Sequence, residues 1–322
     1  MIKTFKLAVL ASLAATLTAF ADIRLNETFT ISGYISASAA QTETDGVKDR
    51  FMDVDSVKVK GVASFDKVTG TVSMHTFTSH EPVILDAFAT YAVSPSTSVT
   101  VGNFLSTLGF EAWDYPNMLQ ISYANTLGAF IPAYQSGVRL DVTSGSLSGG
   151  ISLLDSVYGP TYYKGDGDLD NGGGAEAFLK FSKGDSSLFA ALAVDDGVGG
   201  TTDNRYTVDL WAQTKAGATT LAAEYCYSRL KTGGIEADGF FWLLLAMQPL
   251  NDKWTITGRV SGGEDESLAI GGPTPSFYKG TISPAVAITN NLGVLLEYSY
   301  TKFNDYGAEK SHFVGAQAIF KW

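Results

Sequence analysis

Apolar and polar side chains alternate along the chain in segments of roughly ten residues, from about residue 27 to the end. In 291–301, Leu292 and Val294 fall on one side of an extended strand, while Glu297 and Ser299 fall on the other. A period of two over this length predicts a β-strand with one apolar and one polar face.

Sixteen such segments can be counted, and nothing in the pattern indicates long helices. They begin near Glu27, Phe51, Val68, Val83, Val99, Tyr134, Leu147, Gly174, Ser186, Asn204, Ala218, Asp238, Lys253, Phe277, Asn291 and Lys310. The segment 238–250 is the least regular, because Phe241, Leu243 and Leu245 make both of its faces apolar. The spacing fits tilted transmembrane strands of about 9–11 residues, so the sequence predicts an all-β chain.

The connections between these segments alternate in length. Short turns are expected at Asp66-Lys67, 94–98, 144–146, 183–185, 215–217, Asn251-Asp252 and Thr289-Asn290. Longer loops are expected at 40–50, 79–82, 109–133, 158–173, 195–203, 229–238, 264–276 and 302–310. Short turns at one end and long loops at the other favour a transmembrane antiparallel up-and-down β-barrel of 16 strands with periplasmic N- and C-termini. A secreted β-sandwich is the alternative.

The N-terminus is typical of an export signal. Lys3 and Lys6 precede an uncharged apolar stretch, 7–20, and small residues at Ala19 and Ala21 predict cleavage before Asp22. The stretch is too short to span a bilayer as a helix. We therefore expect a signal peptide over 1–21 and a barrel domain over 22–322, located in the outer membrane of a Gram-negative cell.

The polar face of the segments carries charges of both signs at mid-strand. These residues are Lys58, Lys60, Asp86, Arg139, Asp141, Glu176, Lys180, Arg205, Asp209, Glu224, Arg259, Glu297 and Lys321. In a membrane barrel the apolar face meets lipid, so a charged inner face indicates a water-filled lumen. Sixteen strands suffice to enclose an aqueous channel. We expect these side chains to line a pore.

The overall charge further narrows the functional classes. The chain has 22 basic and 33 acidic residues, which argues against a nucleic-acid partner. The eight long loops hold nineteen of the acidic and seven of the basic residues. An acidic mouth concentrates cations, so a mild cation preference is one hypothesis, and an ordinary solvated loop surface is the other.

The C-terminal segment has a second kind of regularity. Apolar residues occupy every second position back from the last residue, including Phe320 and Trp322. This arrangement resembles the signature that the outer-membrane barrel assembly machinery reads. Several aromatic residues also fall near expected strand ends, where membrane-interface girdles form: Tyr91, Tyr225, Tyr227, Trp254, Tyr298 and Phe320.

With these features together, the chain resembles the bacterial outer-membrane porins, and more narrowly a β-barrel porin family. The stretch 102–111 (GNFLSTLGFE), Pro132, Gly137-Val138 and the closing Phe320-Lys321-Trp322 carry the resemblance. It implies passive diffusion of small hydrophilic solutes and ions, contact with outer-membrane lipid, and a homotrimer as in general porins.

In general porins the third extracellular loop folds into the barrel and narrows it. By count that loop is 109–133 here, and it carries Glu111 and Asp114 without a basic residue. Folded inward, it would be a constriction loop that places acidic groups opposite Arg139, Lys180, Arg205 or Arg259 on the wall. Opposed charges across a narrowing create a transverse field that selects solutes. A loop packed over the mouth is the alternative.

Other chemistry finds little support. Asp166, Asp168 and Asp170 resemble a calcium-binding loop, but an EF-hand would place Gly at Asn171 and Glu at Ala177, so they are only a weak metal candidate. No nucleophile motif occurs, so we expect neither an enzyme nor a cofactor. The functional alternative is a closed structural or adhesive barrel that acts through its extracellular loops.

Overall fold

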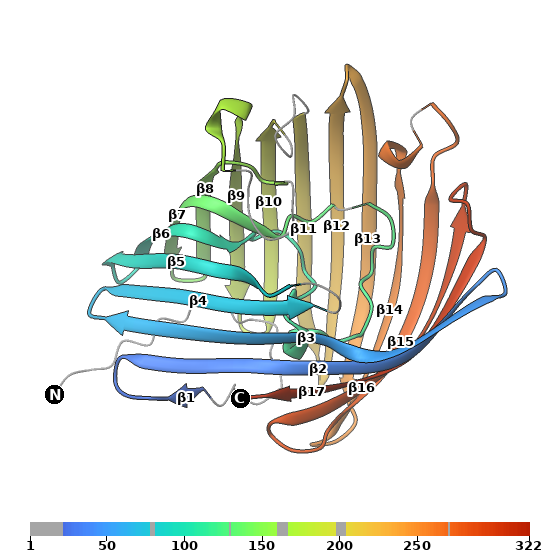
Figure 1. Ribbon diagram of the computed structural model, residues 1–322, viewed down its shortest axis with the longest axis horizontal. Helices are drawn as coiled ribbons and strands as arrows, with labels where there is room; N and C mark the ends of the chain where they lie inside the picture. Colours follow the sequence, from blue (N-terminus) through green and yellow to red (C-terminus); the bar gives the residue numbers. More distant parts are fainter. Residues whose placement is uncertain (1–21, 78–80, 129, 160–166, 198–203, 270) are drawn as a thin grey trace.

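The computed structural model describes residues 22–77, 81–128, 130–159, 167–197, 204–269 and 271–322. The expected signal peptide, 1–21, therefore lies outside the described residues. Most described residues belong to long strands that together form one curved, closed wall (Figure 1). Among the helices of this described part, none is both long and apolar enough to cross a bilayer.

The strands follow one another around the wall in chain order. They are β1 (Ile23–Arg24), β2 (Phe29–Thr44), β3 (Val47–Phe65), β4 (Val68–Phe77), β5 (Val83–Ser94), β6 (Thr97–Leu105), β7 (Tyr134–Ser144), β8 (Leu147–Leu154), β9 (Gly173–Lys183), β10 (Ser186–Asp196), β11 (Asn204–Ala216), β12 (Thr219–Thr232), β13 (Ile235–Pro249), β14 (Trp254–Asp265), β15 (Ser276–Ala287), β16 (Leu292–Asn304) and β17 (Lys310–Lys321). The described parts of the connections contain three single-turn 3₁₀ helices: η1 (Tyr115–Asn117), η2 (Leu169–Asn171) and η4 (Glu266–Leu268).

Strands β2 to β17 form a closed antiparallel barrel of sixteen strands, as the sequence predicted. Each strand pairs with the next, and β17 pairs with β2 to complete the ring. Trp322 takes part in this closure, because its backbone N–H donates to the carbonyl of Gly33 over 3.0 Å and its carbonyl accepts from the N–H of Gly33 over 2.9 Å. The short strand β1 pairs only with the start of β2.

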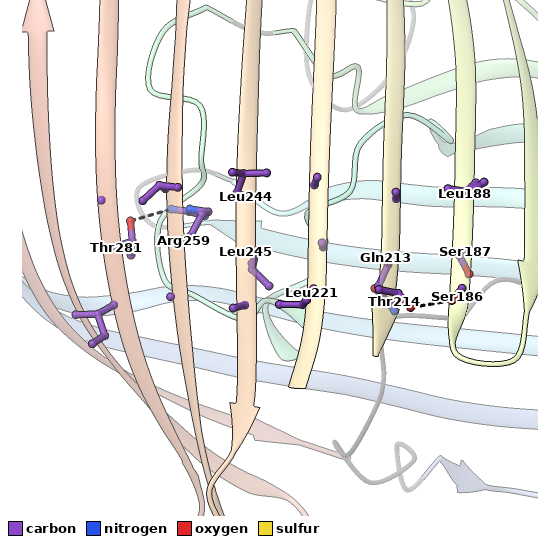
Figure 2. A pocket seen from close by; sticks show the side chains of 18 of the residues that line it. Ser186, Ser187, Leu188, Gln213, Thr214, Leu221, Leu244, Leu245, Arg259 and Thr281 are labelled. Atoms are coloured by element: carbon purple, nitrogen blue, oxygen red, sulfur yellow. Dashed lines mark hydrogen bonds between the residues drawn. The ribbon is translucent and has the colours of Figure 1, made fainter. Parts of the chain in front are cut away.

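The two faces of the strands differ as a membrane barrel requires. In β10 every second residue is exposed, including Leu188, Leu192 and Val194, while the residues between them are buried. An apolar side chain exposed on the outside of a barrel is stable when it contacts lipid instead of water. The outer surface also carries a shallow groove of about 1200 Å³ across β10 to β16, lined by apolar residues such as Leu188 and Leu244 (Figure 2).

Two predictions of long loops are wrong. Segment 40–50 is a hairpin whose turn is Asp45-Gly46, and segment 229–238 is a hairpin whose turn is Gly233-Gly234. In both turns the two central residues have positive φ, between 50° and 86°. This conformation matches the twist of paired strands, and Asp-Gly and Gly-Gly are the residue pairs that adopt it most easily. Strands β3 and β13 therefore begin at Val47 and Ile235, before the expected starts.

Candidate functional site

The connection between β6 and β7 runs through the inside of the barrel. Residues 106–128 and 130–133, called the inner loop below, leave β6 and reach strands on the other side of the ring (Figure 1). The backbone N–H of Gly109 donates to Asp209 on β11 over 2.8 Å, and that of Phe110 donates to Glu224 on β12 over 2.7 Å. Both carboxylates face inward and are buried, so the inner loop is held against the far wall.

Inward-facing carboxylates on other strands accept further hydrogen bonds from the inner loop. Glu297 on β16 accepts from the backbone N–H of Ile121 over 2.6 Å and from that of Ser122 over 3.1 Å. Glu176 on β9 accepts from the hydroxyl of Ser106 over 2.6 Å. An irregular segment has backbone N–H groups without ladder partners, and a charged acceptor satisfies them strongly. The carboxylates therefore position a loop that has no regular structure of its own.

The acidic side chains of the inner loop pair with basic residues of the wall. Glu111 pairs with Arg259 on β14, whose guanidinium also donates to Thr281 on β15 over 3.3 Å (Figure 2). Asp114 pairs with Lys58 on β3 over 2.9 Å. Arg259 was one of four wall partners expected for this loop, whereas the pairing with Lys58 was not foreseen.

The sequence reasoning missed two further anchoring residues. Lys279 on β15 is buried, and its ammonium donates to the hydroxyl of Ser122 and to the carbonyl of Tyr123, both over 2.8 Å. Asp195 on β10 accepts from the backbone N–H of Val157 in the next long connection over 2.9 Å. The period-two pattern could have found Lys279, because it alternates with the exposed Tyr278. Asp195 was expected to lie in the loop 195–203, but β10 extends to Asp196 and includes it.

The other expected wall residues face inward without binding the inner loop through their charged groups. Asp86 on β5 pairs with the wall residue Lys58 over 3.2 Å. Arg139 pairs with Asp141 on its own strand over 3.0 Å. The guanidinium of Arg205 lies 4.0 Å from the ring centroid of Tyr158.

Three expected wall lysines occupy different surroundings. The ammonium of Lys180 is 5.3 Å from the ring centroid of Trp211, and Lys60 is half-buried. Lys321 lines the cavity described below. The sequence predicted that all thirteen charged wall residues line a water-filled lumen. Nine of the thirteen are buried instead, with at most 8% of each residue exposed. The inner loop and large neighbouring side chains cover them.

An apolar cluster fills part of the interior between β9 and β13. The rings of Phe178, Phe189 and Trp211 stack along neighbouring strands, with centroid separations of 5.9 and 5.0 Å. Phe110 of the inner loop packs edge-on against Trp211 at 5.7 Å, and Leu108 belongs to the same buried cluster. This explains why 238–250 is apolar on both faces: the inner side of β13 packs against this cluster while its outer side meets lipid.

A cavity of about 910 Å³ lies inside the barrel near the end that carries the short turns. Pro116, Met118 and Leu119 of the inner loop form one side of it. The opposite side comes from β13 to β17 and includes Thr257 and Lys321. The cavity thus joins apolar surface to a small number of polar groups.

The acidic motif at 166–170 gains no support as a metal site. Asp166 lies outside the described residues. The carboxylate of Asp168 accepts the backbone N–H of Asp170 over 3.0 Å, which is ordinary capping of a 3₁₀ turn. Within the described ranges, no group of three or more His, Cys, Asp or Glu side chains is arranged to hold a metal ion.

Several solved structures with a similar fold are outer-membrane proteins. The chain superposes on OmpF of Salmonella typhi in complex with daunomycin with a TM-score of 0.69 and 13% identity, covering 94% of this chain and 100% of that one. An anion-selective porin from Comamonas acidovorans gives 0.68 and 11%, covering 92% and 99%. The outer membrane channel DcaP of Acinetobacter baumannii gives 0.68 and 12%, covering 91% and 97%. At these identities the likeness concerns the fold alone.

The sequence itself matches a family model described as "Putative beta-barrel porin-2, OmpL-like" over residues 29–321. The chain belongs to this family. No curated protein matches this porin in sequence. Its family and its fold together support an outer-membrane channel, as the resemblance in the sequence implied.

Proposed function

We propose that this porin conducts small hydrophilic solutes and ions by passive diffusion, through a lumen that the inner loop narrows. The observation that carries the proposal is the attachment of the inner loop to the wall by ion pairs, through Glu111 to Arg259 and through Asp114 to Lys58. A loop fixed in this way restricts passage without closing on its own, which is the behaviour of a size filter. The proposal leaves no role for an enzyme or a cofactor.

The charges at the narrowing favour selection by charge as well as by size. Glu111 and Asp114 lie on the inner loop, and their basic partners lie on the wall. Lys279 adds another positive charge on the same side as Arg259. Each acid contacts its basic partner directly, so a solute passes beside these pairs and meets charges of both signs along its path. We therefore include the expected wall residues, such as Lys60 and Arg205, in the proposed pore lining.

A mild preference for cations is the finer part of the proposal. The whole chain carries a net charge of −11, and its connections at the loop end are rich in acidic residues. A negative mouth raises the local concentration of cations within about 8–10 Å of the surface at physiological salt.

Conductance in a planar bilayer tests the proposal. The purified full-length protein should produce stepwise openings of constant size in potassium chloride, and the reversal potential in a salt gradient should have the sign of a cation-preferring pore. A reversal potential of the opposite sign would remove the cation preference and keep the pore. A silent bilayer, with folded protein shown to be inserted, would contradict the pore itself.

A closed adhesive or structural barrel is a second candidate, and one observation favours it. Nine charged wall residues are buried, and the apolar cluster fills part of the interior. Charges in a wide aqueous channel would be more exposed. The silent bilayer described above is the outcome that this second function expects.

We further propose that the folded chain is a homotrimer that the barrel assembly machinery inserts after the signal peptide is removed. A trimer form of OmpT from Vibrio cholerae has this fold, with a TM-score of 0.65, 13% identity and coverage of 92% of this chain and 100% of that one. Phe320 is exposed toward lipid, and Trp322 closes the ring, so the terminal strand is well placed for recognition during insertion. Chemical cross-linking in native membranes should give a three-subunit species.

A further inference from the structure

The cavity inside the barrel at its short-turn end has the size and the setting of a ligand site. Its volume is about 910 Å³. Protein pockets that bind small molecules span roughly 300–1,000 Å³ and are mostly apolar, with a few polar groups among them. Residues of the inner loop line the cavity on one side, and the turns at 251–252 and 289–290 contribute to the rest. A solute that passes the inner loop therefore reaches this cavity before it leaves the barrel.

The inner wall changes from polar to apolar where it borders the cavity. Ala285, Leu295 and Ile319, on β15, β16 and β17, face inward and line it. Inward positions of the same three strands that lie farther from the short turns are polar: Thr281, Glu297 and Gln317. Apolar side chains gain nothing from contact with water, whereas an apolar solute that covers them is stabilised. This part of the wall therefore favours a solute with an apolar body.

Two methionines give the apolar lining an adaptable shape. Met118 of the inner loop and Met247 of β13 both line the cavity and are buried. An unbranched thioether side chain adopts several shapes at little cost, so it fits irregular apolar surfaces. The lining thus indicates a class of apolar groups and not one particular molecule.

Lys321 brings a positive charge to this apolar wall. It follows Ile319 by two residues on the inward face of β17 and is buried. The other charged residues of the lining are Asp252 and Lys253, which are exposed neighbours of opposite sign in the turn between β13 and β14. With two basic residues and one acidic residue, the lining carries one net positive charge.

The acidic groups that face the interior above the cavity have other partners. Asp55 accepts hydrogen bonds from three side chains of β2 and β17. Glu111 and Asp114 form the ion pairs of the inner loop described above. Glu297 accepts two backbone N–H groups of the same loop. These contacts direct the carboxylates toward the loop and the wall, so they leave the positive character of the cavity lining in place.

We propose that the cavity binds water-soluble monoanions with an apolar body, such as short aliphatic or aromatic monocarboxylates. The carboxylate accepts a charge-assisted hydrogen bond from Lys321. The apolar body covers Leu295, Ile319 and the two methionines, which removes their surface from water. This inference rests on the proposed function, because it names the class of solute that the channel selects.

The chemistry of the lining disfavours other solutes. A fully hydroxylated solute would lose hydration against apolar side chains that offer no hydrogen bonds. A second carboxylate or an ammonium group would meet the same penalty more strongly, because it is charged. The acidic loops lie at the other end of the barrel, so a cation preference there and monoanion binding here concern different parts of the path.

Equilibrium dialysis against the folded full-length protein in detergent micelles tests the proposal with three labelled six-carbon probes. Hexanoate has both required features. Gluconate keeps the single negative charge but has a hydroxylated body, and hexylammonium keeps the apolar body but has a positive charge. We expect saturable binding of hexanoate, and binding of the other two probes that is weaker by about tenfold or more.

Variants of the lining test the position of the site. Lys321→Gln should weaken hexanoate binding by about tenfold, because a charge-assisted hydrogen bond is lost. Lys321→Arg keeps the charge and should bind normally, which guards against a folding defect at this position. Ala285→Phe fills the cavity from an inward position and should abolish saturable binding. Val260→Phe places the same ring on the lipid-facing side of β14 and should leave the binding unchanged.

Conductance of the same preparations in a planar bilayer separates this inference from the proposed function. Steady openings without saturable hexanoate binding, or with equal binding of all three probes, would overturn the inference and keep the pore. Full hexanoate binding by Lys321→Gln and Ala285→Phe, or an equal loss in Val260→Phe, would overturn it as well. A silent bilayer together with the expected binding pattern would contradict the pore and support the cavity as a binding site.

Discussion

The inner loop meets two halves of the barrel wall in different ways. Toward β9 to β13 it inserts Leu108 and Phe110 into a buried apolar cluster with Trp211 and its neighbours. Its backbone N–H groups there also donate to buried carboxylates on β11 and β12, but the basic residues that pair with its acids lie on β14 and β3. Toward β14 to β17 and β3 it is held by ion pairs and charge-assisted hydrogen bonds, through Arg259, Glu297 and other wall residues. Apolar packing excludes water and leaves little freedom, whereas polar anchors keep donors and acceptors beside the cavity.

The difference indicates that the two halves of the wall have different roles, one in positioning the inner loop and one in setting the charge beside the cavity. The apolar half fixes where the inner loop sits, because close packing has one best arrangement. The polar half decides what charge a passing solute meets, because the cavity is bordered by its strands and by Lys321. Variants that affect stability should therefore cluster on one half, and variants that affect ion passage should cluster on the other.

The largest effect is expected from Phe110→Ala. Phe110 is 2% exposed and packs against Trp211, so truncation leaves a cavity and should reduce the free energy of unfolding by about 3–4 kcal/mol. Urea unfolding in detergent, followed by tryptophan fluorescence, measures this. Leu210→Ala, on the lipid-facing side of β11, is the matched control with a smaller loss. Equal losses in the two variants would show that the internal cluster is not a packed core.

Arg259→Ala should have the next largest effect, and mainly on conductance. The change leaves Glu111 without its cation and frees this part of the inner loop, with a cost of about 2 kcal/mol for the unpaired carboxylate. Single-channel conductance should rise by about twofold as the narrowing widens. Arg139→Ala is the control, since Arg139 pairs with Asp141 on its own strand. An unchanged conductance in the Arg259 variant would exclude the inner loop as the narrowing.

A milder change at the polar half is Glu297→Gln. The amide oxygen still accepts from the inner loop, but the hydrogen bonds from Ile121 and Ser122 lose their charge assistance, which should cost about 1 kcal/mol. Open-channel current noise should increase because the loop moves more. Glu264→Gln, an exposed glutamate on β14, should behave like the unaltered protein. Quiet current in both variants would contradict the anchoring role of Glu297.

The smallest expected effect concerns Lys321→Gln at the cavity. Loss of one positive charge from the lining should shift the cation-to-anion permeability ratio upward by about 1.5-fold with little change in stability. The reversal potential in a potassium chloride gradient reports this ratio. Lys67→Gln, in the turn between β3 and β4, carries the same charge change away from the cavity. A shift of equal size in the Lys67 variant would mean that general surface charge, and not the cavity, sets the ratio.

Most strand positions could be predicted from the sequence, because successive residues point alternately to lipid and to the interior. The outward positions are therefore apolar and most inward positions are polar. Strand starts such as Val68, Tyr134 and Asn204 agree with the structure to the residue. The hairpin turns at Asp45-Gly46 and Gly233-Gly234 were missed although their residue pairs signal them, because neighbouring charged residues suggested loops. The site was predicted only in part: the acidic inner loop was identified with Arg259 among four expected partners, but its contacts with Lys58 and Lys279 were not foreseen.

Period-two alternation is a local feature, so the chain alone determined a sixteen-stranded membrane barrel and the inward direction of its charges. Which of those charges pair with each other depends on how 106–133 crosses the interior, and that path brings together residues more than a hundred positions apart, such as Glu111 and Arg259. No local pattern encodes such a distance. Only the tertiary structure decided that wall carboxylates hold a loop, because their partners are backbone N–H groups, which every residue except proline carries.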